Sequence, residues 1–169
     1  MRRTIFSCAL AAIFAVFGLV ACDNEAKNSS SFTTNAAQGG MAEVQLGNLA
    51  LAKAQSAEIK QFAEHMVADH TKANNDLKEV AAKKSVALPT EVGDEHKSTL
   101  DRLSKLSGAD FDKAYVKAMV KDHEKDVKEF QTQSETGTDA DVKAFATNTL
   151  PTLKAHLEMI KGIDGRMMK

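Results

Sequence analysis

The chain has 169 residues, with 22 basic and 23 acidic side chains and a formal net charge of −1 at pH 7. This balance excludes a strongly basic surface, so we expect no nucleic-acid partner. Only two cysteines occur, and Cys8 falls in a segment that we expect to be removed, which excludes an internal disulfide in the remaining protein.

The first residues have the layout of a secretory signal. Arg2 and Arg3 give a positive start, and the stretch 4–20 is uncharged and mostly apolar. It is short for a membrane-spanning helix, which needs about 20 apolar residues. The stretch leads into Leu19-Val20-Ala21-Cys22, which resembles the lipobox of bacterial lipoproteins. We therefore expect residues 1–21 to be a signal peptide and Cys22 to carry palmitate that holds the protein to a membrane.

The expected location is the bacterial cell envelope, on its periplasmic side. Asp23 follows the cysteine and resembles the inner-membrane retention signal of enteric bacteria, a rule that varies between lineages, so inner and outer membrane both stay open. Residues 22–34 contain the lipidated cysteine and a polar, serine-containing stretch, which predicts a flexible tether. The remaining residues, 35–165, suit one domain with one core.

Four long stretches of that domain show helical periodicity, which predicts an all-α bundle. The first stretch runs from Asn35 to about Ala54, and Asn35 with Gln38 forms a capping box at its start. Gly40 and Gly47 lie on a stripe of small residues along it. Because glycine inside a helix costs about 1 kcal/mol relative to alanine, we expect another helix to approach closely there.

The second stretch, from about Ala57 to Lys84, spaces its apolar residues at alternating steps of four and three. Pro89 breaks the connector that follows it. Three leucines at positions 100, 103 and 106 then predict a short extra helix that covers one end of the bundle.

The third stretch begins at Asp110, and the fourth is predicted to be capped by Thr138 and to end near Gly162. Pro151 lies inside the fourth stretch. Since proline removes a backbone donor and crowds the preceding turn, we predict a kink there.

Three histidines fall on the apolar seams of three different helices: His70, His123 and His156. Counted from the turn near residue 55, His70 lies at about the level of Glu43, which belongs to the small-residue stripe. His156 lies about five residues farther from the next helical turn than His123 does, a mismatch of about 7 Å at 1.5 Å per residue. We expect the kink at Pro151 to absorb it.

Inward histidines and a glutamate from different helices are the usual construction of a metal site in a bundle. We therefore predict one transition-metal ion, copper, zinc or iron, bound through Glu43, His70, His123 and His156. Nearby methionines favour copper, or zinc if the thioethers stay out of the coordination.

The segment Met66-Val67-Ala68-Asp69-His70 recurs as Met119-Val120-Lys121-Asp122-His123. Each aspartate is either an alternative ligand or orients the imidazoles by a hydrogen bond. Met66 and Met119 are alternative ligands, or core residues of the ordinary kind. The other two histidines, His65 and His96, are expected to face solvent.

A different interpretation stays open at this point. Core histidines with a glutamate also form structural hydrogen-bond networks that fix helix register, in a non-catalytic module that recruits an envelope protein or peptidoglycan. The sequence contains no phosphate-binding loop, nucleophile elbow or paired-cysteine motif, so we expect a binding protein rather than an enzyme.

Several motifs resemble a ferritin-like family of domains of unknown function whose members carry an outer-membrane label. They are Gly39-Gly40-Met41-Ala42-Glu43-Val44, Leu46-Gly47-Asn48-Leu49-Ala50, the two Met-Val-x-Asp-His segments, Phe111-Asp112-x-Ala114-Tyr115, and Thr149-Leu150-Pro151-Thr152-Leu153-x-x-His156. The resemblance implies a ferritin-like four-helix bundle and no established activity. The chain departs from the di-iron pattern, because it has no Glu-x-x-His step on any helix.

Overall fold

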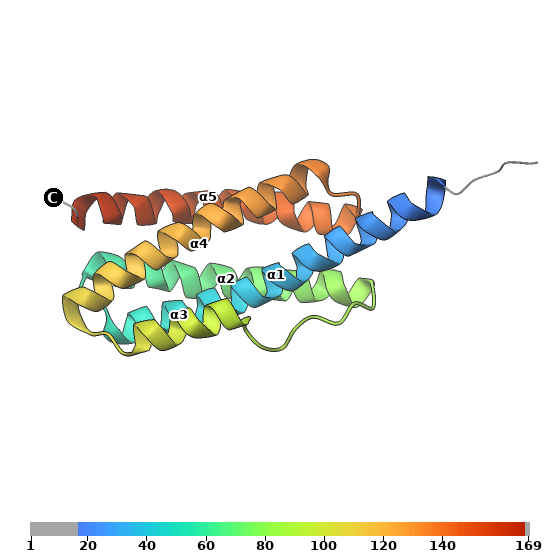
Figure 1. Cartoon of the computed structure of the whole chain (residues 1–169). Helices are drawn as coiled ribbons and strands as arrows, with labels where there is room; N and C mark the ends of the chain where they lie inside the picture. Colours follow the sequence, from blue (N-terminus) through green and yellow to red (C-terminus); the bar gives the residue numbers. More distant parts are fainter. Residues whose placement is uncertain (1–16, 168–169) are drawn as a thin grey trace, which may run out of the picture.

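The computed structural model describes the backbone of residues 17–167 and the side chains of residues 29–167. Within this range the chain forms five helices and no strand, so the predicted all-α fold is confirmed. They are α1 Phe17–Lys53, α2 Ala57–Lys83, α3 Asp94–Ser104, α4 Gly108–Thr136 and α5 Ala140–Met167 (Figure 1).

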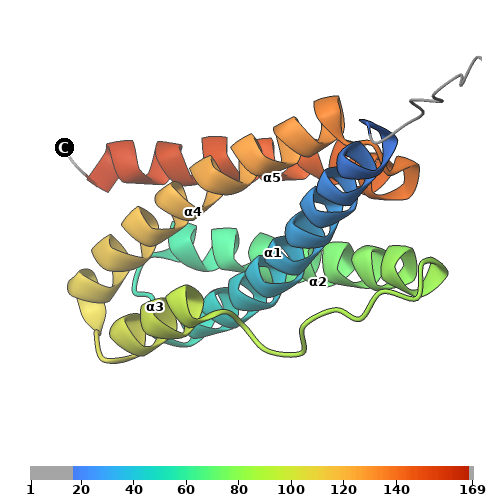
Figure 2. The same ribbon diagram turned by 45° about the vertical axis from the view of Figure 1, so that its right-hand side comes forward.

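The long helices pack as two antiparallel pairs, α1 with α2 and α4 with α5. The pairs meet chiefly through α2 and α5, and α1 also contacts α4. The short helix α3 lies beside α1 and α4 (Figure 2), where Leu103 is fully buried and Leu100 and Leu106 are partly buried. The sequence therefore predicted this extra helix correctly, with Leu100 and Leu103 on its apolar face, whereas Leu106 follows the end of the helix at Ser104.

The core consists of two apolar clusters separated along the bundle axis. One cluster contains Met66, Met119 and Ile160, and the other contains Leu77, Phe130 and Leu153. On each of the four long helices, one buried polar residue lies between the part that enters the first cluster and the part that enters the second: Glu43, His70, His123 and His156. The candidate site is thus a polar layer inside an otherwise apolar core.

The start of the bundle differs from the sequence prediction. Helix α1 begins at Phe17 and runs through the segment 22–34, so the capping box predicted at Asn35 is wrong. Phe32 is 3 % exposed, and its ring packs edge-on against Phe130 with centroids 4.9 Å apart. Burial of this ring stabilises helix in a segment whose serines, taken alone, favour a loop.

The predicted cap of the last helix is also wrong. Thr138 does not cap α5, because Asp139 accepts the backbone N–H groups of Asp141 and Val142 at 3.1 Å.

Two backbone N–H groups at the α1–α2 turn, those of Gln55 and Ser56, donate to the buried carboxylate of Asp112 on α4. This contact fixes the level of the first turn relative to α4 and so sets the register of the polar layer.

The segments that carry the export prediction lie mostly outside the described residues. These are residues 1–16, with Arg2, Arg3 and Cys8, and the side chain of Cys22. Among residues 17–167, no helix combines the length and apolar character that crossing a membrane requires.

The predicted close approach of a second helix to the small-residue stripe is confirmed. A Cβ on Gly47 would lie 2.8 Å from Cγ2 of Val67 and 3.2 Å from the backbone oxygen of Ala63, both on α2. On Gly40 it would meet the side chain of Asn74. The backbones of α1 and α2 therefore approach closely at Gly47, whereas at Gly40 the neighbour is a side chain that can move.

Replacing Gly47 by alanine should lower the free energy of unfolding by about 1–3 kcal/mol, because overpacking outweighs the gain in helix propensity. Gly39 provides the control, since nothing lies within 4 Å of a Cβ built there. Gly39→Ala should raise the free energy of unfolding by up to about 1 kcal/mol. Urea denaturation followed by circular dichroism measures both, and a Gly47→Ala variant at least as stable as the original chain would contradict the close packing.

Candidate metal centre

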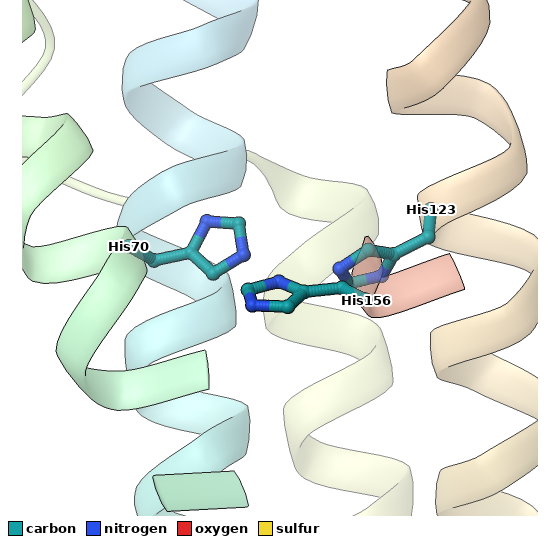
Figure 3. Close-up of side chains that lie close together, drawn as sticks. All are labelled: His70, His123 and His156. Carbon is teal, nitrogen blue, oxygen red and sulfur yellow. The ribbon is translucent and has the colours of Figure 1, made fainter. Parts of the chain in front are cut away.

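Three histidine rings meet at the centre of the polar layer. His70 comes from α2, His123 from α4 and His156 from α5, and their ring centroids lie 5.3–5.8 Å apart (Figure 3). The three residues are 4 %, 0 % and 2 % exposed. One nitrogen from each ring lies within 4.8 Å of the other two. The sequence prediction that these side chains converge is therefore correct.

Each imidazole is held by one of its two nitrogens. His70 Nδ1 lies 2.7 Å from Glu43 Oε2, and His156 Nε2 lies 2.9 Å from Asp69 Oδ2. His123 Nδ1 lies 3.1 Å from the backbone oxygen of Met119. Because a carbonyl oxygen only accepts, His123 must carry its proton on Nδ1 and present an unprotonated Nε2 when neutral.

The other nitrogen of each ring has no hydrogen-bond partner among the described residues. These atoms are Nε2 of His70, Nε2 of His123 and Nδ1 of His156, all of them buried. An unpaired buried polar atom costs about 1–3 kcal/mol, and three such atoms side by side are unusual in a core. Where histidines bind a metal ion, one nitrogen of each ring is typically hydrogen-bonded and the other binds the metal.

Burial keeps these rings neutral. It lowers the pKa of His70 to about 4 and the pKa of His123 to about 3. The pKa of His156 is also lowered, again mainly by burial. At neutral pH the lone pairs of the open nitrogens are therefore available without loss of a proton, as metal coordination requires.

Glu43 touches two of the three histidines but lies at the side of the cluster. Its Oε2 binds His70, and its Oε1 lies 3.5 Å from His123 Nε2. Burial, followed by repulsion from Asp122, raises the pKa of Glu43 well above its usual value. The predicted fourth member thus joins the layer: it orients His70, lies 3.5 Å from His123 Nε2 and also groups with Asp122 and Asp126.

The two aspartates of the repeated segments have different positions. Asp69 orients His156 on α5, not its neighbour His70, because adjacent residues on a helix point about 100° apart. Asp122 lies 3.8 Å from His96 Nε2. The prediction that His96 faces solvent is wrong, since its side chain is only 15 % exposed, whereas His65 is exposed as expected.

The two methionines belong to the apolar cluster beside the layer. Met119 contacts His123 through its backbone oxygen.

Two residues at the site were not predicted from the sequence. Phe62 packs its ring about 6 Å from the rings of His123 and His156, and Asp126 joins Glu43 and Asp122. The spacing of Asp126, three residues after His123, places both on one helix face and could have identified it.

Side-chain direction explains how His123 and His156 meet despite the mismatch counted from their turn. Side chains on a helix lean toward its N-terminus. His123 precedes the turn and leans away from it, whereas His156 follows the turn and leans toward it. The leans therefore offset much of the mismatch in an antiparallel pair, and α5 continues as one helix through Pro151. The same geometry brings Glu43 to His70 on the other pair.

Comparison with known proteins adds the following. The family described as Domain of unknown function (DUF4142) matches residues 20–163. No curated protein matches the chain by sequence.

Solved structures share the fold at low sequence identity. A DUF305 fragment from Deinococcus radiodurans has a TM-score of 0.72 and 14 % identity, over 82 % of this chain and 96 % of that one. CopM in its Cu(I)-bound form has a TM-score of 0.70 and 16 % identity, over 83 % and 98 %. The Cu(II)-bound form of CopM gives 0.70 and 16 %, over 82 % and 97 %. The described helices thus form a bundle of the DUF305 type.

The lowered pKa of His123 predicts a loss of stability in acid. Because the folded-state pKa lies below the unfolded value of 6.5, the unfolded chain binds a proton that the folded chain does not. The stability contribution is thus present above pH 6.5 and is lost as pH falls toward 3. Between pH 6 and 4, in chelator, the free energy of unfolding should fall about 1.4 kcal/mol per pH unit more steeply than in a His123→Gln variant. His65→Gln, at an exposed position, should keep the steeper slope, and parallel curves for His123→Gln and the original chain would contradict the burial argument.

Proposed function

This chain belongs to the domain-of-unknown-function family DUF4142, and from its three convergent histidines we propose that it binds one transition-metal ion for metal handling or stress protection in the cell envelope. The ligands are Nε2 of His70, Nε2 of His123 and Nδ1 of His156. The observation that carries the proposal is that these three atoms are buried and unpartnered, while one nitrogen from each of the same rings lies within 4.8 Å of the others.

Copper is the metal that we propose first. Imidazole nitrogens suit copper, zinc and iron. A site whose three proposed ligands are all imidazole nitrogens favours copper or zinc over iron. The similarity to CopM, solved with Cu(I) and with Cu(II), supports copper among these. Glu43 Oε1, 3.5 Å from His123 Nε2, is the nearest candidate for a further ligand.

A groove between α2 and α5 gives a metal ion a route to the cluster. It has a volume of about 320 Å³, and both His70 and Asp69 line it. Four of its lining side chains are carboxylates and two are lysines: Asp69, Asp76, Glu79 and Asp141 against Lys72 and Lys83. An acidic groove raises the local concentration of cations, so its charge fits a cation that enters from solvent.

A purely structural network explains the layer less well. Buried networks stabilise a core only when their members are hydrogen-bonded, and among the described residues one nitrogen of each ring and one oxygen of Glu43 have no partner. A metal ion would satisfy the three nitrogens together. The interaction module considered from the sequence therefore ranks second.

Titration of the purified chain with Cu²⁺ and Zn²⁺, followed by calorimetry, tests the proposal. We expect one site per chain, and an affinity loss of about 100-fold or more in His70→Ala, His123→Ala and His156→Ala, because each removes one ligand. His65→Ala is the matched control, since that side chain is exposed, and it should bind like the original chain. Circular dichroism establishes that each variant is folded.

Three outcomes would overturn the metal site. The first is a chain that takes up no stoichiometric copper or zinc at pH 7. The second is copper binding that survives all three substitutions unchanged, since the metal would then lie elsewhere. The third is binding lost equally in His65→Ala, which would assign the metal to surface histidines.

We further propose that the protein is a lipoprotein, with residues 1–21 as signal peptide, Cys22 as the lipidated residue and a ferritin-like bundle beyond it. The basic start, the apolar stretch and the Leu19-Val20-Ala21-Cys22 segment support the export signal. The location that follows is the periplasmic side of the inner or the outer membrane. A second candidate role there is recruitment of an envelope protein or peptidoglycan.

Radiolabelled palmitate tests the anchor. The label should enter the protein in growing bacteria and should be absent after Cys22→Ala, because that substitution removes the thiol to which we expect the acyl chains to be attached. Two or three acyl chains bind a membrane firmly where one does not, so the labelled protein should sediment with membranes. Equal labelling of both chains would refute lipidation at Cys22.

A further inference from the structure

A group of three carboxylates lies beside the three histidines, and one of its members, Glu43, also contacts His70. Glu43 of α1 and Asp122 and Asp126 of α4 each offer one oxygen, and the three oxygens lie within 4.8 Å of one another. Among the described residues, neither Glu43 nor Asp126 pairs with a lysine or arginine. Like charges this close repel strongly in a core of low dielectric. Burial, followed by repulsion within the group, raises the pKa values of Glu43 and Asp126 well above their usual values, so the charge of the group is relieved by protons or by a bound cation.

One oxygen of this group is an orphan. The side chain of Glu43 is 3 % exposed, and its Oε2 is taken by His70. Its Oε1 is buried, lies 3.5 Å from His123 Nε2 and has no hydrogen-bond partner among the described residues. A carboxylate oxygen without a partner costs more to bury than a neutral group does. A cation bound between the three carboxylates would supply the missing partner.

The space for such an ion is present. A cavity of about 20 Å³ is lined by Glu43, Asp126 and His70, which is about the volume that one water molecule needs. Its lining extends to Asn35 and Glu129, which bind each other at the surface at 2.9 Å. Of the three carboxylates, Glu43 and Asp126 line this cavity, whereas Asp122 lines a separate one together with His96.

His96 adds a nitrogen on the other side. Its Nε2 lies 3.8 Å from Asp122 Oδ1, and α3 carries it against α4. Three carboxylates with one imidazole at their edge form a donor set dominated by oxygen. Such a set suits a hard divalent cation, whereas the three-nitrogen set suits a softer one.

We propose that Glu43, Asp122 and Asp126 form a second cation site, which binds a hard divalent cation of the Mn²⁺ type beside the three-histidine cluster. Glu43 connects the two sites, because its Oε2 fixes His70, its Oε1 lies 3.5 Å from His123 Nε2, and one of its oxygens lies within 4.8 Å of Asp122 and Asp126. The proposal rests on the carboxylates and the cavity, and it stands whether or not the three histidines bind copper.

Electron paramagnetic resonance tests the site with Mn²⁺ alone, because the six-line signal of free Mn²⁺ decreases as the ion binds. The original chain should bind one Mn²⁺, and Asp122→Asn and Asp126→Asn should each weaken that binding about tenfold or more. Asp101→Asn is the matched control, because Asp101 is 65 % exposed and pairs with Lys105 on the surface. The control variant should bind Mn²⁺ like the original chain.

Stability measurements keep the test valid if a variant binds nothing. Asp126→Asn removes a like charge from a crowded group, so without metal it should melt at the same temperature as the original chain or higher. Mn²⁺ should raise the melting temperature of the original chain and leave that of Asp126→Asn unchanged. This pattern separates a lost ion from a lost fold.

His156→Ala distinguishes the two sites, since His156 is not among the three carboxylates. It should lose copper and keep Mn²⁺, whereas Asp126→Asn should lose Mn²⁺ and keep copper. An original chain that binds no Mn²⁺, or Mn²⁺ binding that Asp122→Asn and Asp126→Asn leave unchanged, overturns the second site. Mn²⁺ binding that disappears in His156→Ala overturns it as well, because the ion would then occupy the histidines.

Discussion

Four helices of this bundle each place one polar residue between two apolar clusters, and the cost of burying those groups constrains the rest of the structure. A polar atom in a core must find a partner or lose about 1–3 kcal/mol. Glu43, Asp69 and the backbone oxygen of Met119 provide partners for one nitrogen of each histidine. These contacts join α1 to α2 and α2 to α5, so the polar layer fixes the register in which the helices can pack.

The same contacts leave the layer incomplete toward its centre. A ring nitrogen that binds a carboxylate or a carbonyl sets the orientation of the ring and therefore the direction of the opposite nitrogen. In all three histidines that opposite nitrogen is buried and has no hydrogen-bond partner among residues 29–167. Burial also keeps the imidazoles neutral, because a charged ring at this depth would lose its hydration. One nitrogen of each ring is thus fixed by a contact with an oxygen, and the other is unpaired among the described residues.

Close packing of α1 on α2 brings Glu43 next to the histidines of the polar layer. Gly47 allows the backbones to approach, and Glu43, four residues earlier on the same face of α1, then reaches His70. Asp112 adds a tie from the first turn to α4, where Asp122 and Asp126 lie. Nitrogen and oxygen atoms consequently form two neighbouring groups, which are the two metal sites that we propose.

The sequence alone determined the helices, the extra helix after Pro89 and the inward direction of His70, His123 and His156, because these follow from periodicity within about 20 residues. It misplaced the start of α1, since Phe32 is held by rings more than ninety positions later in the chain. It also placed His96 at the surface and gave no role to Asp126. It did not identify His156 as the partner of Asp69, and it counted a difference in level between His123 and His156. Only the tertiary structure decided these points, because helix contacts and side-chain lean depend on how distant segments pack, and a local pattern carries no information about its partner.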